Sequence, residues 1–99
     1  RMTRVVDPDE VELAAVQGLA DLSGKFVLDI GCGDGRTSRR LARTAASVLG
    51  VDPDSAAVDQ ARQSSTEYPT HKCRYLAADV LALELEPASF DIVVFSRSL

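Results

Sequence analysis

Three glycines at every second position, Gly31, Gly33 and Gly35, constrain this chain more than any other feature of its sequence. They separate an apolar run at 25–30 from a stretch at 36–45 whose apolar residues have helical spacing. Glycine allows a backbone to turn tightly or to approach another molecule closely. A glycine-rich turn between a strand and a helix typically binds a nucleotide-like ligand. The loop therefore predicts an α/β fold with a binding site at this turn.

Apolar runs and amphipathic stretches alternate along the rest of the chain. The sequence predicts helices over 7–24, 36–45 and 54–65, and strands over 25–30, 47–52, 73–79 and 90–96. A capping-box pattern at Asp7, Pro8 and Glu10 marks the first helix, and Asp54 or Ser55 begins the third. Strands that alternate with helices pair in parallel through right-handed crossovers. We therefore expect an open, doubly wound parallel sheet.

Composition excludes several classes of function. The net charge of −4 argues against a nucleic-acid-binding surface of the basic kind. No apolar run approaches the length of a membrane span, and no signal segment opens the chain. The two cysteines, Cys32 and Cys73, form no metal-spaced pair, so we expect no metal site. Isolated thiols of this kind are typical of a reduced, cytoplasmic protein.

The loop does not match the two common phosphate-binding fingerprints. The dinucleotide pattern G-x-G-x-x-G, started at Gly31, needs glycine at position 36, where this chain has Arg36. Asp29 and Asp34 would also place two carboxylates near a pyrophosphate. No Gly-Lys-Ser/Thr follows, so the loop is not a P-loop. The acids instead favour a ligand that carries an ammonium and a sulfonium.

The glycine loop and three later segments of the chain resemble motifs of a known family. "VLDIGCGDG" resembles the first motif of the Rossmann-like, class I S-adenosylmethionine-dependent methyltransferases, acid-x-Gly-x-Gly-x-Gly. "VLGVDPD", "LAADVLALEL" and "FDIVVFSRSL" are similar to that family's second, third and fourth strands. The resemblance implies a Rossmann-like sheet with four of its strands in this chain, in the order 3-2-1-4, and S-adenosylmethionine as the cofactor.

The resemblance also implies which residues bind the methionine part of the cofactor. The backbone at the three loop glycines, with Cys32 between them, would pass under this part. Asp29 would orient the loop and balance the ammonium, directly or through water. Ser96, at the end of the fourth strand, would offer its backbone carbonyl to the same ammonium.

The adenosine part would be bound by residues that follow the second and third strands. Asp52 would accept from both ribose hydroxyls, since one carboxylate can accept several hydrogen bonds. Pro53 would lie against the adenine. Asp79 would accept from the exocyclic amine of the adenine, and Val80 would border the ring.

The function that the resemblance implies is methyl transfer to a small-molecule acceptor whose atom the sequence leaves open. No catalytic residue is identified, because the sulfonium is already a good leaving group and a general base is needed only for some acceptors. Two alternatives remain open. One is a fragment of an NAD(P)-binding oxidoreductase, because an acid about 20 residues after the loop also holds the ribose there. The other is a non-catalytic module that binds S-adenosylmethionine.

Residues 1–99 are expected to be the cofactor-binding part of a larger methyltransferase domain, truncated after the fourth strand, and inactive alone. In the family's sheet further strands lie beyond the fourth. The segment 90–96 would then be an exposed, apolar edge, and such edges recruit other strands. We therefore expect self-association through this segment.

Overall fold

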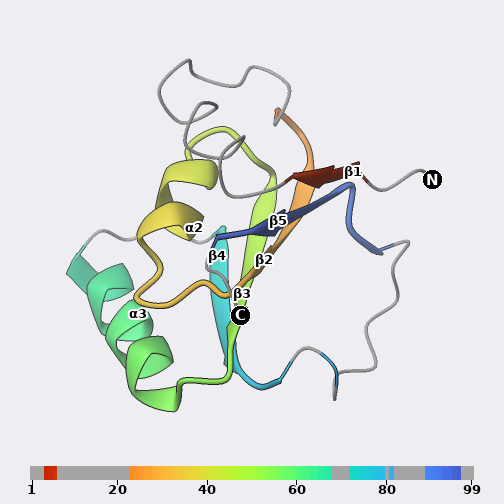
Figure 1. Cartoon of the computed structure of the whole chain (residues 1–99). Helices are drawn as coiled ribbons and strands as arrows, with labels where there is room; N and C mark the ends of the chain where they lie inside the picture. The colour runs from red at the N-terminus through yellow and green to blue at the C-terminus, as the bar shows by residue number, and fades with distance from the viewer. Residues whose placement is uncertain (1–3, 7–22, 68–71, 80, 82–88, 97–99) are drawn as a thin grey trace.

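The computed structural model describes residues 4–6, 23–67, 72–79, 81 and 89–96. These residues form one sheet with two helices (Figure 1). The strands are β1 (Arg4–Val6), β2 (Phe26–Ile30), β3 (Ser47–Asp52), β4 (Cys73–Ala77) and β5 (Ile92–Phe95), and the helices are α2 (Arg36–Leu41) and α3 (Ser55–Glu67). Of the predicted helix over 7–24, residues 7–22 lie outside the described residues.

The sheet is parallel throughout and has the strand order β1-β5-β2-β3-β4. The four predicted strands are β2, β3, β4 and β5 in chain order, so they confirm the predicted order 3-2-1-4. Two aspartates lie near the ends of the ladders: Asp29, opposite Gly50, is one pair before the end of the β2–β3 ladder, and Asp52, opposite Ala77, ends the β3–β4 ladder. The parallel arrangement brings the carboxyl ends of all the strands to one edge of the sheet, where an open α/β sheet binds its ligands.

The prediction that the fourth strand is an exposed edge is wrong. β1 pairs with β5 in parallel, with Arg4 opposite Ile92 and Val6 opposite Val94. The other side of β5 pairs with β2. The short sequence "RVV" was not predicted as a strand, because three residues carry too little periodicity to be recognised. Since β5 is paired on both sides, it offers no free edge for self-association.

Both described helices pack on one face of the sheet (Figure 1). α2 is shorter than predicted because its last turn is tight, with Arg43 N–H donating to Arg40 O at 3.2 Å. Its predicted apolar stripe is nevertheless buried. That stripe is Leu41, Ala42 and Ala45, and it packs against Val27, Val48, Ile92 and Val94. α3 begins after Asp54, whose Oδ1 accepts from the N–H groups of Ala56 and Ala57, confirming Asp54 as the cap.

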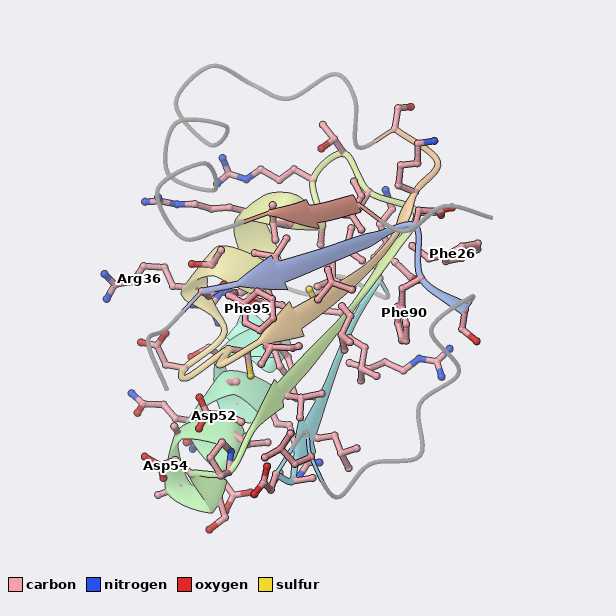
Figure 2. All side chains as sticks on the ribbon, turned by 45° about the vertical axis from the view of Figure 1, so that its right-hand side comes forward. Phe26, Arg36, Asp52, Asp54, Phe90 and Phe95 are labelled. Atoms are coloured by element: carbon pink, nitrogen blue, oxygen red, sulfur yellow. The ribbon has the colours of Figure 1, made fainter. Side chains whose placement is uncertain are left out.

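The opposite face of the sheet carries a second apolar cluster, built around Leu28, Ile30 and Val51. Phe26, at the start of β2, is 42% exposed. Figure 2 shows Phe26 and Phe90 at the amino ends of the strands, whereas Phe95 and Asp52 lie at the carboxyl ends. None of the helices described is long and apolar enough to cross a membrane.

Candidate functional site

The glycine loop is tied to the end of β3. Val51 O accepts from both Gly31 N–H at 2.7 Å and Cys32 N–H at 3.1 Å. Gly33 N–H donates to Asp52 Oδ2 at 2.9 Å. These hydrogen bonds hold the loop, which follows β2, against the carboxyl end of the neighbouring β3.

The three loop glycines have positive φ, 78° at Gly31, 55° at Gly33 and 83° at Gly35. A side chain at Gly35 would also collide with its surroundings, because a Cβ there would lie 2.8 Å from Tyr75 Oη and 2.9 Å from Tyr75 Cε1. Glycine at this position is therefore required by the left-handed backbone and by the tyrosine of β4 beneath it. From the sequence, Gly35 was expected only to contact the ligand.

Asp29 is completely buried at the end of β2, behind the loop. Ser38 Oγ donates to its Oδ2 at 2.6 Å, and Ser96 Oγ donates to its Oδ1. Burial raises the pKa of Asp29 to about 6; the two serine hydroxyls lower it in part, and the nearby Asp52 carboxylate adds to the rise. The carboxylate of Asp29 thus joins α2 to the end of β5, and none of its atoms is exposed to solvent.

Asp52 is also engaged by the protein, with only 4% of its surface exposed. Its Oδ2 accepts from Gly33 N–H, and its Oδ1 accepts from Asp54 N–H at 2.9 Å. The side chain therefore links the glycine loop to the turn that begins α3.

Two cavities open at the carboxyl ends of the strands. The one we call the apolar cavity has a volume of about 440 Å³ and is lined by Ile30, Gly31, Val51, Pro53, Ala78, Asp79, Leu81 and Phe95. The one we call the loop cavity has a volume of about 360 Å³ and is lined by Cys32, Gly33, Asp34, Arg36, Thr37, Ala57 and Ser96. Because Gly31 lines the first and Cys32 lines the second, consecutive loop residues border both cavities.

The site residues predicted from the sequence lie in the two cavities and in the buried part of the loop. Three line the apolar cavity, namely Gly31, Pro53 and Asp79. Three line the loop cavity, namely Cys32, Gly33 and Ser96. Asp29 and Asp52 are buried behind the loop, and Gly35 is buried within it. Val80 lies outside the described residues. Within the described part of the chain, no group of three His, Cys, Asp or Glu side chains is placed to hold a metal ion.

Sequence reasoning missed Ser38 and Phe95. Ser38 precedes Leu41 and Ala42 by three and four residues, so helical spacing places it on the buried face of α2. A polar residue on such a stripe signals a buried partner, which here is Asp29. Phe95 was included in the fourth strand, but only the sheet register brings it opposite Ile30 at the cavity.

Sequence comparisons place the chain among methyltransferases. The methyltransferase-domain family matches residues 27–99. An uncharacterized methyltransferase of Mycobacterium tuberculosis is 37% identical over 86 residues, which cover 87% of this chain and 42% of that protein. A ubiquinone biosynthesis O-methyltransferase of Paracidovorax citrulli is 39% identical over 90 residues, covering 90% of this chain and 38% of that protein. The chain thus spans about two fifths of the length of these relatives.

A solved structure has the same fold. The magnesium protoporphyrin IX methyltransferase of Synechocystis PCC 6803, with bound SAH, superimposes with a TM-score of 0.73 and 28% sequence identity. The superposition covers 89% of this chain and 41% of that one. The chain therefore shares the Rossmann-like arrangement of its sheet with a methyltransferase whose structure contains bound S-adenosylhomocysteine (SAH).

Proposed function

This chain belongs to the methyltransferase-domain family, and from that premise we propose that the protein transfers a methyl group from S-adenosylmethionine to a small-molecule acceptor. The observation that carries the proposal is the pair of cavities that meet at the glycine loop. One is mostly apolar and suits a nucleobase, whereas the other is lined by charged and polar residues and suits an amino acid. S-adenosylmethionine joins these two parts in one molecule.

The residues of the apolar cavity fit an adenine ring. Pro53 and Phe95 provide apolar surface for its faces. Asp79 Oδ1 accepts from Leu81 N–H at 2.9 Å, which fixes the side chain at the cavity wall. The remaining lone pairs of this carboxylate suit the exocyclic amine of adenine. Val80 is proposed to border the same ring.

The residues around the loop fit the rest of the cofactor. Asp52 is the last residue of β3 and precedes Pro53, and a carboxylate at this place suits the two ribose hydroxyls, because one carboxylate can accept several hydrogen bonds. The loop cavity, with Gly33 and Ser96 on its wall, suits the methionine part. Asp29 would act on this part through Ser96, because its own surface is completely buried.

The cofactor supplies an activated methyl group on a positively charged sulfur. This chain's residues contribute by binding and orienting it, since holding the methyl carbon in line with the acceptor supplies much of the rate. The described residues that line the two cavities include Asp79 and Asp34, and we assign neither a covalent or acid–base step. We propose that acceptor binding is completed by other parts of a larger domain, of which residues 1–99 are the cofactor-binding part.

We also propose that the protein is cytoplasmic. Neither Cys32 nor Cys73 forms a disulfide, which is typical of a reducing compartment. The net charge of −4 favours a small-molecule acceptor over a nucleic acid.

Competition calorimetry tests the proposed cofactor. S-adenosylhomocysteine should bind at least about tenfold more tightly than NAD or NADP, a difference of about 1.4 kcal/mol. Asp52→Asn should weaken this binding by about tenfold or more, since hydrogen bonds to a charged group are worth about 1.5–3 kcal/mol. Asp59→Asn is the matched control, because it removes the same charge from an exposed site on α3. Tighter binding of NAD would support the oxidoreductase alternative instead.

A further inference from the structure

The second half of the glycine loop, residues 34 and 35, is held differently from the first half. The first half is hydrogen-bonded to the end of β3. In the second half, Gly35 N–H closes a turn by donating to Cys32 O at 3.0 Å. Two side chains from other elements, Arg39 of α2 and Tyr75 of β4, lie against this half. The proposed function assigns a role to neither of them.

The ring of Tyr75 is packed between the loop and the rest of the fold. A Cβ at Gly35 would lie 2.8 Å from Tyr75 Oη, and a Cβ at Gly50 of β3 would lie 3.0 Å from Tyr75 Cδ1. The ring therefore extends from β3 to the loop. It belongs to a buried cluster that includes Val58 and Ala61 of α3. Because protein interiors are closely packed, a ring fixed between α3 and β3 gives the loop a rigid surface.

Arg39 holds the peptide group that precedes Gly35. Its Nη1 donates to Asp34 O at 2.8 Å. The same nitrogen lies 3.0 Å from the position of a Cβ at Gly35, so Arg39 and Tyr75 border the same point of the loop. A hydrogen bond from a charged donor is stronger than one between neutral groups. The peptide between Asp34 and Gly35 is therefore fixed by one hydrogen bond and by one packed ring.

This peptide borders the loop cavity. Asp34 lines that cavity, whereas the apolar cavity meets the loop at Gly31, which is hydrogen-bonded to β3. Neither Arg39 nor Tyr75 is among the described residues that line the two cavities. A change at either position should therefore alter the shape of the loop cavity and leave the apolar cavity intact.

We propose that Tyr75 and Arg39 are positioning residues for the cofactor, which fix the peptide between Asp34 and Gly35 and thereby the shape of the loop cavity. Both act through the backbone of the loop and not by touching the ligand. The inference rests on the proposed function, in which the apolar cavity holds the adenine and the loop cavity holds the methionine part. Only ligands that extend beyond the nucleoside should then depend on these two residues.

Two ligands and two variants test this role by calorimetry. S-adenosylhomocysteine reaches both cavities, whereas adenosine lacks the part that enters the loop cavity. Tyr75→Leu removes the ring, and Arg39→Met removes the hydrogen-bond donor but keeps a long side chain. Each variant should bind S-adenosylhomocysteine about fivefold more weakly than the wild type, the size of one contact worth about 1 kcal/mol. The affinity for adenosine should be unchanged.

Conservative and matched variants separate positioning from general damage to the fold. Tyr75→Phe keeps the ring and Arg39→Lys keeps a cationic donor, so each should restore most of the affinity for S-adenosylhomocysteine. Arg40→Met changes an exposed arginine of α2, and Leu76→Ala changes an exposed side chain of β4 on the other face of the sheet. Both controls should leave the two affinities unchanged. Thermal unfolding verifies that each variant is folded, and Arg39→Met tests the proposal alone if Tyr75→Leu does not fold.

Amide hydrogen exchange provides a readout that needs no ligand. Gly35 N–H closes the turn in the second half of the loop, whereas Gly31 N–H is hydrogen-bonded to β3. In Tyr75→Leu and Arg39→Met, the Gly35 amide should exchange faster than in the wild type, and the Gly31 amide should exchange at the same rate. A general loss of stability would speed the exchange of both amides.

The outcomes distinguish this inference from the function on which it rests. Equal losses of affinity for S-adenosylhomocysteine and adenosine, or equal acceleration of the two amides, would overturn the positioning role. Unchanged binding of S-adenosylhomocysteine in both variants would also overturn it. Failure of the wild-type protein to bind S-adenosylhomocysteine, with binding of NAD, would instead refute the proposed cofactor. Amide exchange would then still decide whether Tyr75 and Arg39 fix the loop.

Discussion

Asp29 shows how one residue can serve a binding site without facing it. The resemblance to methyltransferases placed this acid next to the ammonium of the cofactor. In the structure its two oxygens accept from Ser38 and Ser96, and no part of its surface is exposed. Its carboxylate therefore orients two serine hydroxyls, and we propose that it acts on a ligand only through Ser96.

Burial of Asp29 should make the stability of the protein depend on pH. The folded state raises the pKa of this carboxyl from 3.8 to about 6, so it binds the proton more tightly than the unfolded chain does. The resulting stabilisation is complete below about pH 4 and is lost as the pH rises through 6. The loss is about 3 kcal/mol at most. Urea unfolding between pH 4 and 7 should show this fall in the wild type and a flatter profile in Asp29→Asn. If stability falls with pH equally in the wild type and in Asp29→Asn, Asp29 is not the source of the pH dependence.

At the scale of the elements, the glycine loop depends on the strand beneath it. Gly35 precedes α2 with a φ of 83°, and Tyr75 of β4 fills the space where its Cβ would lie. Cys32 has the same relation to Gly50 of β3, where an added Cβ would lie 2.8 Å from Cys32 Cβ. The small residues of the loop are therefore matched to their neighbours in β3 and β4.

Gly35→Ala and Gly24→Ala should differ in their effects on stability. Both glycines have positive φ, 83° and 72°, so each alanine costs about 1–2 kcal/mol from its backbone conformation. A Cβ at Gly24 meets no atom within 4 Å, whereas a Cβ at Gly35 overlaps Tyr75. Overpacking of this kind costs about 1–3 kcal/mol more. Chemical denaturation of the two variants measures the difference. Equal losses of stability in the two variants would show that the Tyr75 side chain moves aside with no loss of free energy.

At the scale of the whole molecule, the sheet is wider than the four strands predicted. β1 adds a fifth strand beside β5, so residues from the beginning and the end of the chain lie next to each other (Figure 1). The cavities at the carboxyl end of the sheet are lined by residues of β2, β3 and β5 and by residues that follow β4, and the two cavities meet at the glycine loop. This assembly suits a cofactor, and the acceptor is proposed to be held elsewhere.

We expect the purified 99-residue chain to transfer no methyl group above background. Methyl transfer requires the acceptor to be held in line with the methyl carbon, and the chain matches only about two fifths of the length of its methyltransferase relatives. Radiolabelled S-adenosylmethionine with a panel of acceptors measures the transfer. Binding of S-adenosylhomocysteine by the same sample is the positive control. Transfer to any acceptor would show that the acceptor site lies within these 99 residues.

The sequence alone was sufficient for the four main strands, the glycine loop and a start of α3 at Asp54 or Ser55, and the resemblance to a known family implied the order of the strands. These features depend on apolar runs, helical spacing and turn residues, which act over short distances along the chain. They also depend on the handedness of parallel crossovers, which is nearly invariant. The family of the chain could be recognised for the same reason, because its motifs are short and occur in a fixed order.

Tertiary structure alone decided the pairing of β1 with β5, the complete burial of Asp29 between two serines, and the need for glycine at position 35, next to Tyr75. Ser96 and Asp29 are 67 residues apart in sequence, and Gly35 and Tyr75 belong to different elements. Neither contact is marked in the sequence by a periodic pattern or by a motif. Each arises from the sheet register, which brings distant residues within a few ångströms and thereby determines which side chains are exposed to a ligand.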